Sequence, residues 1–448
     1  AWIMEYRYRD ASEMKDSGVE WIGNIPKDWT ISRIDKEFNV RNEKVSDKEY
    51  PPLSVTKQGI LPQLENVAKS DNGDNRKKVC VGDFVINSRA DRKGSCGVSI
   101  YDGSVSLICN VLTPKKLHPQ YVHSLFRNYY FSEEFYRWGS GIVDDLWSTN
   151  IEKMKKINIP IPMGEEDEKI ANFLDKKTSQ FDSIISKKEA LIEKLEEAKK
   201  SLISEVVTGK VKVVKSSDGY DLVKRSSDDM KDSGVEWIGE IPKDWEVKRI
   251  KQISNVISKG TTPSTIGREI ADNGKIRFLK AENIYDGDIC LTPQFFIDEE
   301  TNKILKRSEL KEHDVLFVIA GATIGKTAIV KKAHCPANTN QAISFIRLYN
   351  NINYKFVYFW LSSPKLQENM WLYAVQSAQP NLSMENLGNF HIVYPNKEEI
   401  DIITDYIEIN TIKICEIMES IRYQIQKLKE AKQSLISEAV TGKIEILD

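Results

Sequence analysis

The sequence of 448 residues lacks most features that mark metalloproteins and membrane proteins. Its six cysteines form no CxxC pair, and among its five histidines only His334 is adjacent to a cysteine, Cys335. We expect free thiols in a reducing compartment and no metal site. The opening AWIMEYRYRD has no apolar leader, and the longest apolar run, VLFVIAGA at 315–322, is far shorter than the roughly 20 residues of a membrane helix. We therefore expect a soluble, cytoplasmic protein.

Familiar catalytic patterns are absent as well. There is no GxSxG, HExxH, EF-hand loop or helix-opening GxGxxG, and no Asn/Asp-Pro-Pro-aromatic motif of an amino-methyltransferase. AGATIGKT at 320–327 approaches a phosphate-binding loop, but Gly321 lies one residue too close to Gly325, and the following AIVKK is strand-like where such a loop opens a helix. We predict a turn between two strands, no cofactor on this chain and no catalysis. A nucleotide-binding enzyme that uses GATIGKT is the alternative.

The chain does contain a tandem repeat. MKDSGVEWIGNIPKDW at 14–29 matches 230–245 in 15 of 16 positions, and KLEEAKKSLISEVVTGKV at 194–211 matches 427–444 in 14 of 18 positions. The stretches between these matched ends hardly resemble each other. Such a chain, too long for one core, indicates one scaffold used twice to carry two different surfaces.

Each copy has the same three-part organisation. A loop with tryptophan packing anchors comes first, and short β-branched runs broken by Gly, Asn, Asp and Pro then predict strands with tight turns. Each copy ends in a stretch without Gly or Pro, Glu165–Val207 or Lys397–Val440, that stops at Thr-Gly and predicts one helix of about 60 Å. The predicted segments are an N-terminal segment at 1–13, a globular domain at 14–163, a long helix at 164–210, a flexible or extended linker at 211–229, a second globular domain at 230–396, and a second long helix with the C-terminal tail at 397–448.

Apolar residues recur along both long helices at steps of three and four, which is the spacing of a coiled coil. The expected fold class is α+β: two globular α/β domains separated by two long helices that form an antiparallel coiled coil, in a pseudo-twofold tandem repeat. Two amphipathic helices on separate cores are the alternative. The predicted seam consists of Ile170, Leu174, Phe181, Ile184, Leu191, Leu195, Leu202, Ile403, Ile407, Ile414, Ile417, Leu428 and Leu435.

The formal net charge of -2 gives no overall basic signal, so a nucleic-acid partner requires local basic patches. Basic and amide side chains recur in loops of both divergent regions. Lys and Arg neutralise phosphates, Arg reads guanine, and Asn or Gln reads adenine. One such cluster alone fits a solvated face, but the recurrence favours DNA. The candidate DNA-binding residues are Lys57, Gln58, Arg76, Lys77, Lys78, Arg89, Arg92, Lys93, Lys259, Lys275, Arg277, Lys280, Asn283, Lys326, Asn338, Asn340, Gln341, Gln379 and Asn381.

The order of these features, found in both copies, resembles the specificity subunit of type I restriction-modification systems. The resemblance rests on GVEWIG-x-IPKDW, GATIGKTAIV, NTNQAI, QPNLS before a helix, a strand ending in Pro, and KLKEAKQSLISEAVTGKI. The first copy departs from this pattern: it has SRADRKGSCG at 88–97 in place of the GATIGKT segment, and GIVDDLWSTN at 141–150 in place of SAQPNLSMEN at 377–386. Two different target sequences would require such a departure between the copies.

The resemblance implies two target recognition domains that each read one half of a bipartite site in double-stranded DNA. It implies two modification (methyltransferase) subunits, which bring S-adenosylmethionine and methylate adenine, and restriction subunits that use ATP with Mg. The chain itself would be a non-catalytic subunit whose helix pair sets the half-site spacing. A coiled-coil scaffold that binds only protein is a further alternative. The divergent middles disfavour it, because a spacer needs no two distinct surfaces.

Overall fold

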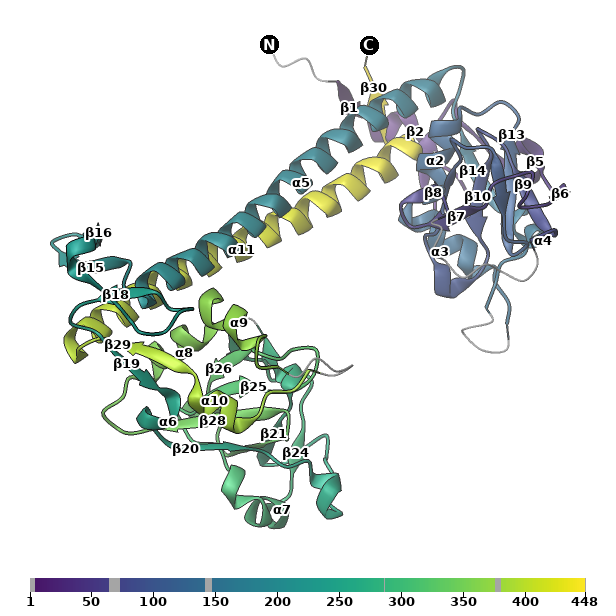
Figure 1. Ribbon diagram of the computed structural model, residues 1–448. Coiled ribbons are helices and arrows are strands. Elements are labelled where there is room, and N and C mark those ends of the chain that lie inside the picture. Colours follow the sequence, from purple (N-terminus) through teal and green to yellow (C-terminus); the bar gives the residue numbers. More distant parts are fainter. Residues whose placement is uncertain (1–4, 64–72, 142–146, 286, 375–379, 448) are drawn as a thin grey trace. The chain divides into compact units, whose positions relative to one another are not determined.

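The computed structural model describes residues 5–63, 73–141, 147–285, 287–374 and 380–447 (Figure 1). The chain divides into two compact units. Unit 1 consists of Ala1–Ala190 with Ile421–Asp448, and unit 2 is Leu191–Ser420. Each unit therefore contains one divergent region and a part of both long helices. None of the helices in the described ranges combines the length and apolarity that crossing a bilayer requires.

Both units contain a four-stranded antiparallel sheet with an equivalent strand order. The order is β11-β10-β13-β5 in unit 1 and β26-β25-β28-β20 in unit 2. The inner strands β10 (Phe84–Asn87) and β25 (Val315–Val318) are buried along their whole length, as expected of short apolar runs covered on both faces. The remaining strands are β5 (Phe38–Val40), β11 (Cys96–Val98), β13 (Cys109–Pro114), β20 (Ser254–Lys259), β26 (Thr327–Ile329) and β28 (Ile343–Leu348).

The second sheet differs between the units. Strand β12 lies antiparallel to β9 in unit 1, whereas β21 lies parallel to β27 in unit 2. The divergent sequences have thus built different second layers on a shared central sheet. The strands of this layer are β6 (Lys44–Val45), β9 (Arg76–Val79) and β12 (Gly103–Val105) in unit 1, and β21 (Ile276–Leu279), β24 (Phe296–Ile297) and β27 (Ala337–Thr339) in unit 2. Two hairpins accompany them: β7 (Leu53–Thr56) with β8 (Gly59–Pro62), and β22 (Ile284–Tyr285) with β23 (Asp288–Ile289).

Short helices pack against the central sheet in both units. In unit 1, α2 (Pro119–Arg127) and α3 (Tyr129–Arg137) carry aromatic residues into the core, and the ring centroid of Phe126 lies 4.6 Å from that of Phe84. In unit 2 the equivalent helices are α8 (Tyr354–Ser362) and α9 (Pro364–Met370). The other short elements are α1 (Ile34–Glu37), α4 (Ile151–Met154), α6 (Ile250–Ile253), α7 (Glu299–Ile304), α10 (Met384–Asn389), β2 (Met14–Asp16), β3 (Asn24–Pro26), β4 (Thr30–Arg33), β14 (Asn158–Ile161), β17 (Met230–Asp232), β18 (Glu240–Pro242), β19 (Glu246–Arg249) and β29 (His391–Tyr394).

The long helices are α5 (Glu166–Val207) and α11 (Lys397–Val440), within one residue of the predicted ranges. The side chain of Asn396 accepts a hydrogen bond from the Glu399 N–H at 2.9 Å, so it caps α11 as its position before Lys-Glu-Glu predicts. Both helices end at Thr-Gly, where Gly209 and Gly442 have φ of 72° and 70°. These left-handed glycines stop the helices, because a side chain there would be strained.

The nearly identical ends of the two copies make the same contacts in the two units. The Nε1 of Trp29 donates to Glu166 at 2.7 Å in unit 1, and the Nε1 of Trp245 donates to Glu399 at 2.8 Å in unit 2. Both indoles are fully buried, which confirms them as packing anchors. The matched sequences are therefore explained by packing: in each copy, the tryptophan that ends IPKDW fixes the start of a long helix.

The long helices run antiparallel within each unit. In unit 1 the Nζ of Lys432 lies 2.6 Å from Asp182 and that of Lys188 lies 2.6 Å from Gln424 Oε1; in unit 2 the Nζ of Lys199 lies 3.3 Å from the Cys415 Sγ. Buried and half-buried positions follow one heptad pattern, offset by 233 residues between the helices. These positions are Leu174, Thr178, Phe181, Ile185, Lys188, Ile192, Leu195, Lys199, Leu202 and Val206 on α5, and Ile407, Thr411, Ile414, Met418, Ile421, Ile425, Leu428, Lys432, Leu435 and Ala439 on α11. The predicted fold class, two α/β domains in tandem with an antiparallel pair of long helices, is confirmed.

Three residues of the predicted seam were assigned wrongly. Ile184 and Leu191 are 45% exposed and Ile417 is 50% exposed, while Ile185 and Met418 are buried. After Phe181 the prediction advanced by three residues to Ile184 and then by seven to Leu191. In the structure the next inward-facing residue is four positions after Phe181, at Ile185. Ile184 is followed by a second isoleucine, so the apolar pattern alone allowed either position. The other predicted seam residues are buried or half-buried.

Segment 211–229 begins with a regular hairpin. Strands β15 (Val211–Ser216) and β16 (Gly219–Lys224) pair over six residue positions. In unit 1 the same place is filled by β1 (Tyr6–Tyr8) and β30 (Ile444–Ile446), which pair antiparallel although they lie near opposite ends of the chain. The described part of the N-terminal segment is therefore a strand of unit 1 that pairs with the C-terminal tail.

Candidate nucleic-acid interface

Two pairs of loops carry basic and amide residues that differ between the copies, and the pairs occupy equivalent positions in the two units. The first loop pair consists of residues 88–94, after β10, and 147–149, before α4. The second loop pair consists of residues 319–326, after β25, and 380–382, before α10. In unit 1 the Ala90 N–H donates to the Trp147 carbonyl at 2.9 Å; in unit 2 the Gly321 N–H donates to the Pro380 carbonyl at 3.1 Å. One backbone frame thus presents two different sets of side chains.

Residues 319–326 of the second loop pair form the turn between antiparallel strands β25 and β26. A strand follows its Lys-Thr, so the loop cannot aim a helix N-terminus at phosphate, and the prediction of a turn is confirmed. Gly325 has φ of 88°, and its carbonyl accepts from the Gln367 side chain of α9 at 2.9 Å. Lys326 and Asn381 are exposed on the loops, and the Lys326 ammonium lies 5.5 Å from the ring centroid of Tyr285. The second loop pair thus presents the Lys326 cation from a turn held by Gln367 and the Asn381 amide from the neighbouring loop.

The first loop pair presents cations that are paired with carboxylates. Asp91 lies 3.1 Å from the Nε of Arg89 and 3.7 Å from the Nε of Arg92. The Nζ of Lys93 lies 2.5 Å from Glu133 of α3. The Arg92 side chain is 68% exposed and is the most exposed of these three cations. These side chains reach solvent, where a phosphate or a base edge can approach them.

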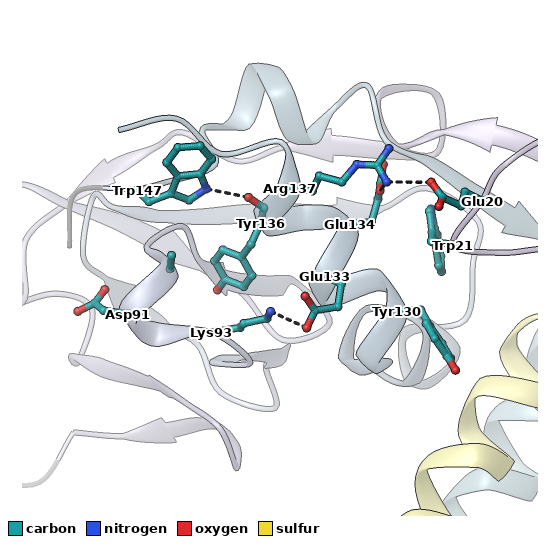
Figure 2. A pocket seen from close by; sticks show the side chains of 11 residues that line it. Glu20, Trp21, Asp91, Lys93, Tyr130, Glu133, Glu134, Tyr136, Arg137 and Trp147 are labelled. Carbon is teal, nitrogen blue, oxygen red and sulfur yellow. Dashed lines mark hydrogen bonds and ion pairs between the residues drawn. The ribbon is translucent and has the colours of Figure 1, made fainter. Parts of the chain in front are cut away.

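A cavity of about 900 Å³ opens beside the first loop pair (Figure 2). Aromatic side chains contribute much of its wall, and the Nε1 of Trp147 donates to the Tyr136 carbonyl at 2.8 Å, which ties loop to helix α3. Arg137 lies 3.0 Å from Glu20 and 3.6 Å from Glu134, so one cation faces two carboxylates of the cavity. The wall of the cavity contains more carboxylates than cations.

Three predicted DNA-binding residues are buried and have structural roles instead. The Nε of Arg76 donates to the Ser104 hydroxyl at 2.9 Å, and burial lowers the pKa of its guanidinium. The Asn283 amide donates to two carbonyls, and the Asn338 Oδ1 accepts from Ser308 at 2.8 Å. These three assignments were wrong, because side chains of short strands and turns can face either layer of the sheets and polar composition does not tell which.

Two neighbours of Arg76 are also engaged within unit 1. The half-buried Lys77 donates to the Cys109 carbonyl at 2.7 Å, and burial lowers its pKa. Lys78 lies 3.0 Å from Glu43 and 4.8 Å from the Tyr50 ring centroid, and hydrogen bonds with Tyr50 and Glu43 raise its pKa. The strand β9 that carries both lysines is thus held by its own unit rather than open to a phosphate.

The remaining predicted residues differ in their exposure. Lys57 and Gln58 are exposed at the tip of the β7–β8 hairpin, and Lys275 and Gln341 are exposed in unit 2. Lys280 is half-buried, with its ammonium 3.3 Å from the ring centroid of Phe295. Lys259, Arg277 and Asn340 are also half-buried, and Gln379 lies outside the described residues.

Two residues that sequence reasoning missed are Asp91 and Glu133. The search for basic residues did not consider Asp91, although it lies between two cations in Arg-Ala-Asp-Arg-Lys. Glu133 lies 40 residues from its partner Lys93, and no local pattern connects them. Among the described residues, no group of three or more His, Cys, Asp or Glu side chains could hold a metal ion, and all six cysteines are free thiols.

A doubled α/β unit with unlike cation- and amide-bearing loops on an equivalent frame defines a protein that presents two different surfaces from one repeated scaffold. The chain matches the family model of the type I restriction modification DNA specificity domain at residues 26–197 and 242–434, one match in each copy. Because these matches cover most of the sequence, the chain belongs to this family. It therefore provides DNA sequence specificity in a type I restriction-modification complex.

Relatives and solved structures agree with this assignment. The MjaVIII specificity subunit of Methanocaldococcus jannaschii is 25% identical over 94% of this chain and 94% of its own length. The EcoBI specificity subunit of Escherichia coli is 26% identical over 64% of this chain and 58% of its own length. A chain from a structural study of complex assembly and conformational transition of the type I R-M system has a TM-score of 0.69 at 13% identity, covering 94% of this chain and 99% of that one. The HsdS subunit of Thermoanaerobacter tengcongensis has a TM-score of 0.50 at 14% identity, covering 94% and 98%. At these identities the solved structures show the shared fold.

Proposed function

We propose that the first loop pair contacts one half of a bipartite, asymmetric site in double-stranded DNA and the second loop pair contacts the other half. The observation that supports this is the shared backbone frame: the Ala90–Trp147 and Gly321–Pro380 hydrogen bonds place unlike loops at one position of the fold. Cations there neutralise phosphates, and Arg and Asn side chains also read base edges. Unlike side chains on one frame are what two unlike half-sites require.

We propose further that two modification subunits dock on this chain, one at each set of matched ends. Equivalent surfaces bind equivalent partners, and the SLISE-x-VTGK segments of α5 and α11 make the same kind of packing contacts in their units. The modification subunits would supply S-adenosylmethionine, and restriction subunits would use ATP with Mg. The chain would act without a catalytic step of its own, in the cytoplasm, with the length of the helix pair setting the half-site spacing. The segments at 14–163 and 230–396 are the proposed target recognition domains.

The contact of both loop pairs with DNA is tested by removing one exposed cation from each. In the chain assembled with its modification subunits, Arg92→Gln and Lys326→Gln should each weaken binding to the cognate duplex about fivefold to a hundredfold, because each removes a contact to a phosphate or a base. The measurement is a titration of a labelled duplex at several salt concentrations. Each variant that loses a phosphate contact should also show a shallower dependence on salt.

The matched control is Lys306→Gln, which removes an exposed lysine of unit 2 outside both loop pairs. It should bind like the unchanged chain. If Arg92→Gln and Lys326→Gln also bind like the control, the loop pairs do not contact DNA. That result would favour the protein-binding scaffold.

A further inference from the structure

The three cations of the first loop pair form ion pairs with two carboxylates of their own unit. Asp91 pairs with both arginines of the loop, at 3.1 Å and 3.7 Å. Glu133 pairs with Lys93 at 2.5 Å (Figure 2). Asp91 belongs to the loop itself, in the turn Ala90–Arg92, whereas Glu133 projects from α3. Two different elements thus supply the anions that hold the loop's cations.

The second loop pair has no such arrangement. Residues 319–326, IAGATIGK, include no Asp or Glu, and the same is true of 380–382. Within the part of the chain that the structure describes, Lys326 makes no ion pair, and its near neighbour is the ring of Tyr285. The two units therefore present loops on the same frame that differ in charge pairing: three cations in ion pairs in unit 1, and one lysine without a carboxylate partner among the described residues in unit 2.

This difference matters most for DNA that lacks the target sequence. Non-specific affinity comes almost wholly from phosphate neutralisation by Lys and Arg. A phosphate that approaches the first loop pair competes with Asp91 or Glu133 for the cations, and the charge of these carboxylates repels it. At the cognate site, base contacts add free energy that non-cognate DNA does not supply. The carboxylates therefore weaken non-cognate binding without removing the contacts that read the site.

The surroundings of Glu133 support a dedicated pairing with Lys93. The other carboxylates of the cavity, Glu20 and Glu134, are already paired with Arg137. The Tyr136 ring centroid lies 6.0 Å from the Lys93 ammonium, and its hydroxyl donates to a backbone carbonyl before the loop at 3.0 Å. Lys93 is thus held at a position that the helix α3 fixes.

We propose that Asp91 and Glu133 are specificity-determining residues of unit 1. They hold Arg89, Arg92 and Lys93 in ion pairs that compete with non-cognate phosphates, so that unit 1 binds DNA more stably at its target than elsewhere. The proposal rests on the proposed contact between the first loop pair and DNA. It assigns to two acidic residues a role in discrimination against non-cognate DNA.

The test compares Asp91→Asn and Glu133→Gln in the chain assembled with its modification subunits. Each variant should bind a duplex without the target about twofold to fivefold more tightly, which is the scale of an exposed ion pair. Binding to the cognate duplex should rise less, so the ratio of specific to non-specific affinity falls. The double variant should fall further than either single one. Affinities are measured by titration of both duplexes at equal salt.

Glu20→Gln is the matched control, since Glu20 lines the same cavity but pairs with Arg137 rather than with the loop. Its specificity ratio should stay unchanged. An equal effect of Glu20→Gln would show that only overall charge matters and would overturn the proposal. Unchanged ratios in Asp91→Asn and Glu133→Gln would overturn it too; if Arg92→Gln still weakens binding in the same assay, the proposed DNA contact stands without the acidic residues. If Arg92→Gln also has no effect, the proposed contact of this loop fails with it.

Discussion

At the residue scale, His123 of α2 is a group whose protonation opposes folding. Its Nδ1 accepts the Val98 N–H of β11 at 3.2 Å, and burial, together with the nearby Arg127 charge, lowers its pKa from 6.5 to about 4. The folded chain therefore keeps the imidazole neutral where the unfolded chain protonates it. The stability that depends on this neutral ring is complete above pH 6.5 and is lost as the pH falls toward 4.

The predicted consequence is a pH-dependent free energy of unfolding. Between pH 7.5 and pH 5 the linkage amounts to about 2 kcal/mol, because the unfolded state alone binds the proton over this range. The His123→Gln variant should lose that part of the decline when urea unfolding is measured at both pH values. An equal decline in the variant and the unchanged chain would mean that His123 does not titrate in this way.

Burial also decides which polar residues the sequence could identify as DNA contacts. The Arg-Lys-Lys run of β9 reads as a basic patch, yet Arg76 faces the core and the Ser104 hydroxyl. Asn338 of Asn-Thr-Asn-Gln-Ala lies within a hydrogen-bond network with Ser308 and Asn302. Side chains alternate between the two faces of a sheet, so a shift of one residue moves each side chain to the other face. Strands of three or four residues are too short for an apolar pattern to show which face each side chain occupies. The loop cations Arg92 and Lys326 are exposed, because turns leave their side chains in solvent, and their contact with DNA stays a prediction.

At the scale of elements, two adjacent isoleucines in α5 test which face of the helix packs in the helix pair. Ile185 is 8% exposed and Ile184 is 45% exposed. Replacing the buried side chain removes packing from the helix pair, so Ile185→Ala should destabilise unit 1 by about 2 kcal/mol or more, while Ile184→Ala should cost under about 0.5 kcal/mol. Urea unfolding of the full chain gives both values. Equal losses, or a larger loss for Ile184→Ala, would contradict the observed seam.

The long helices were the most predictable elements. Absence of Gly and Pro over about 40 residues, the Asn396 cap and the terminal Thr-Gly fixed both ends to within one residue. The seam was less predictable, since Lys188 and Lys199 occupy half-buried positions that an apolar pattern cannot find. Composition alone could not predict the hairpin after α5. Its Ser, Asp and Lys residues suit a linker, but Val213 is buried and its strand pairs with β16.

At the scale of the whole molecule, the repeat explains which parts of the sequence match and which differ. In each unit a tryptophan of the matched segment donates the same hydrogen bond to a glutamate in the first turn of a long helix, and β1 with β30 fills the place of the β15–β16 hairpin. The divergent regions keep the central sheet and change the second layer and the loops. Division of the molecule into a shared frame and unlike surfaces is therefore visible in both sequence and structure.

The central claim is that the two units read two separate half-sites of one DNA target. It is tested most directly by mapping methylated adenines in cells that express the chain with its modification subunits, for the unchanged chain and for a Lys326→Gln, Asn381→Ser variant of the second loop pair. We predict a bipartite motif whose one half is relaxed or altered in the variant, while the other half and the spacing stay unchanged. A single continuous motif, or changes in both halves at once, would contradict the account.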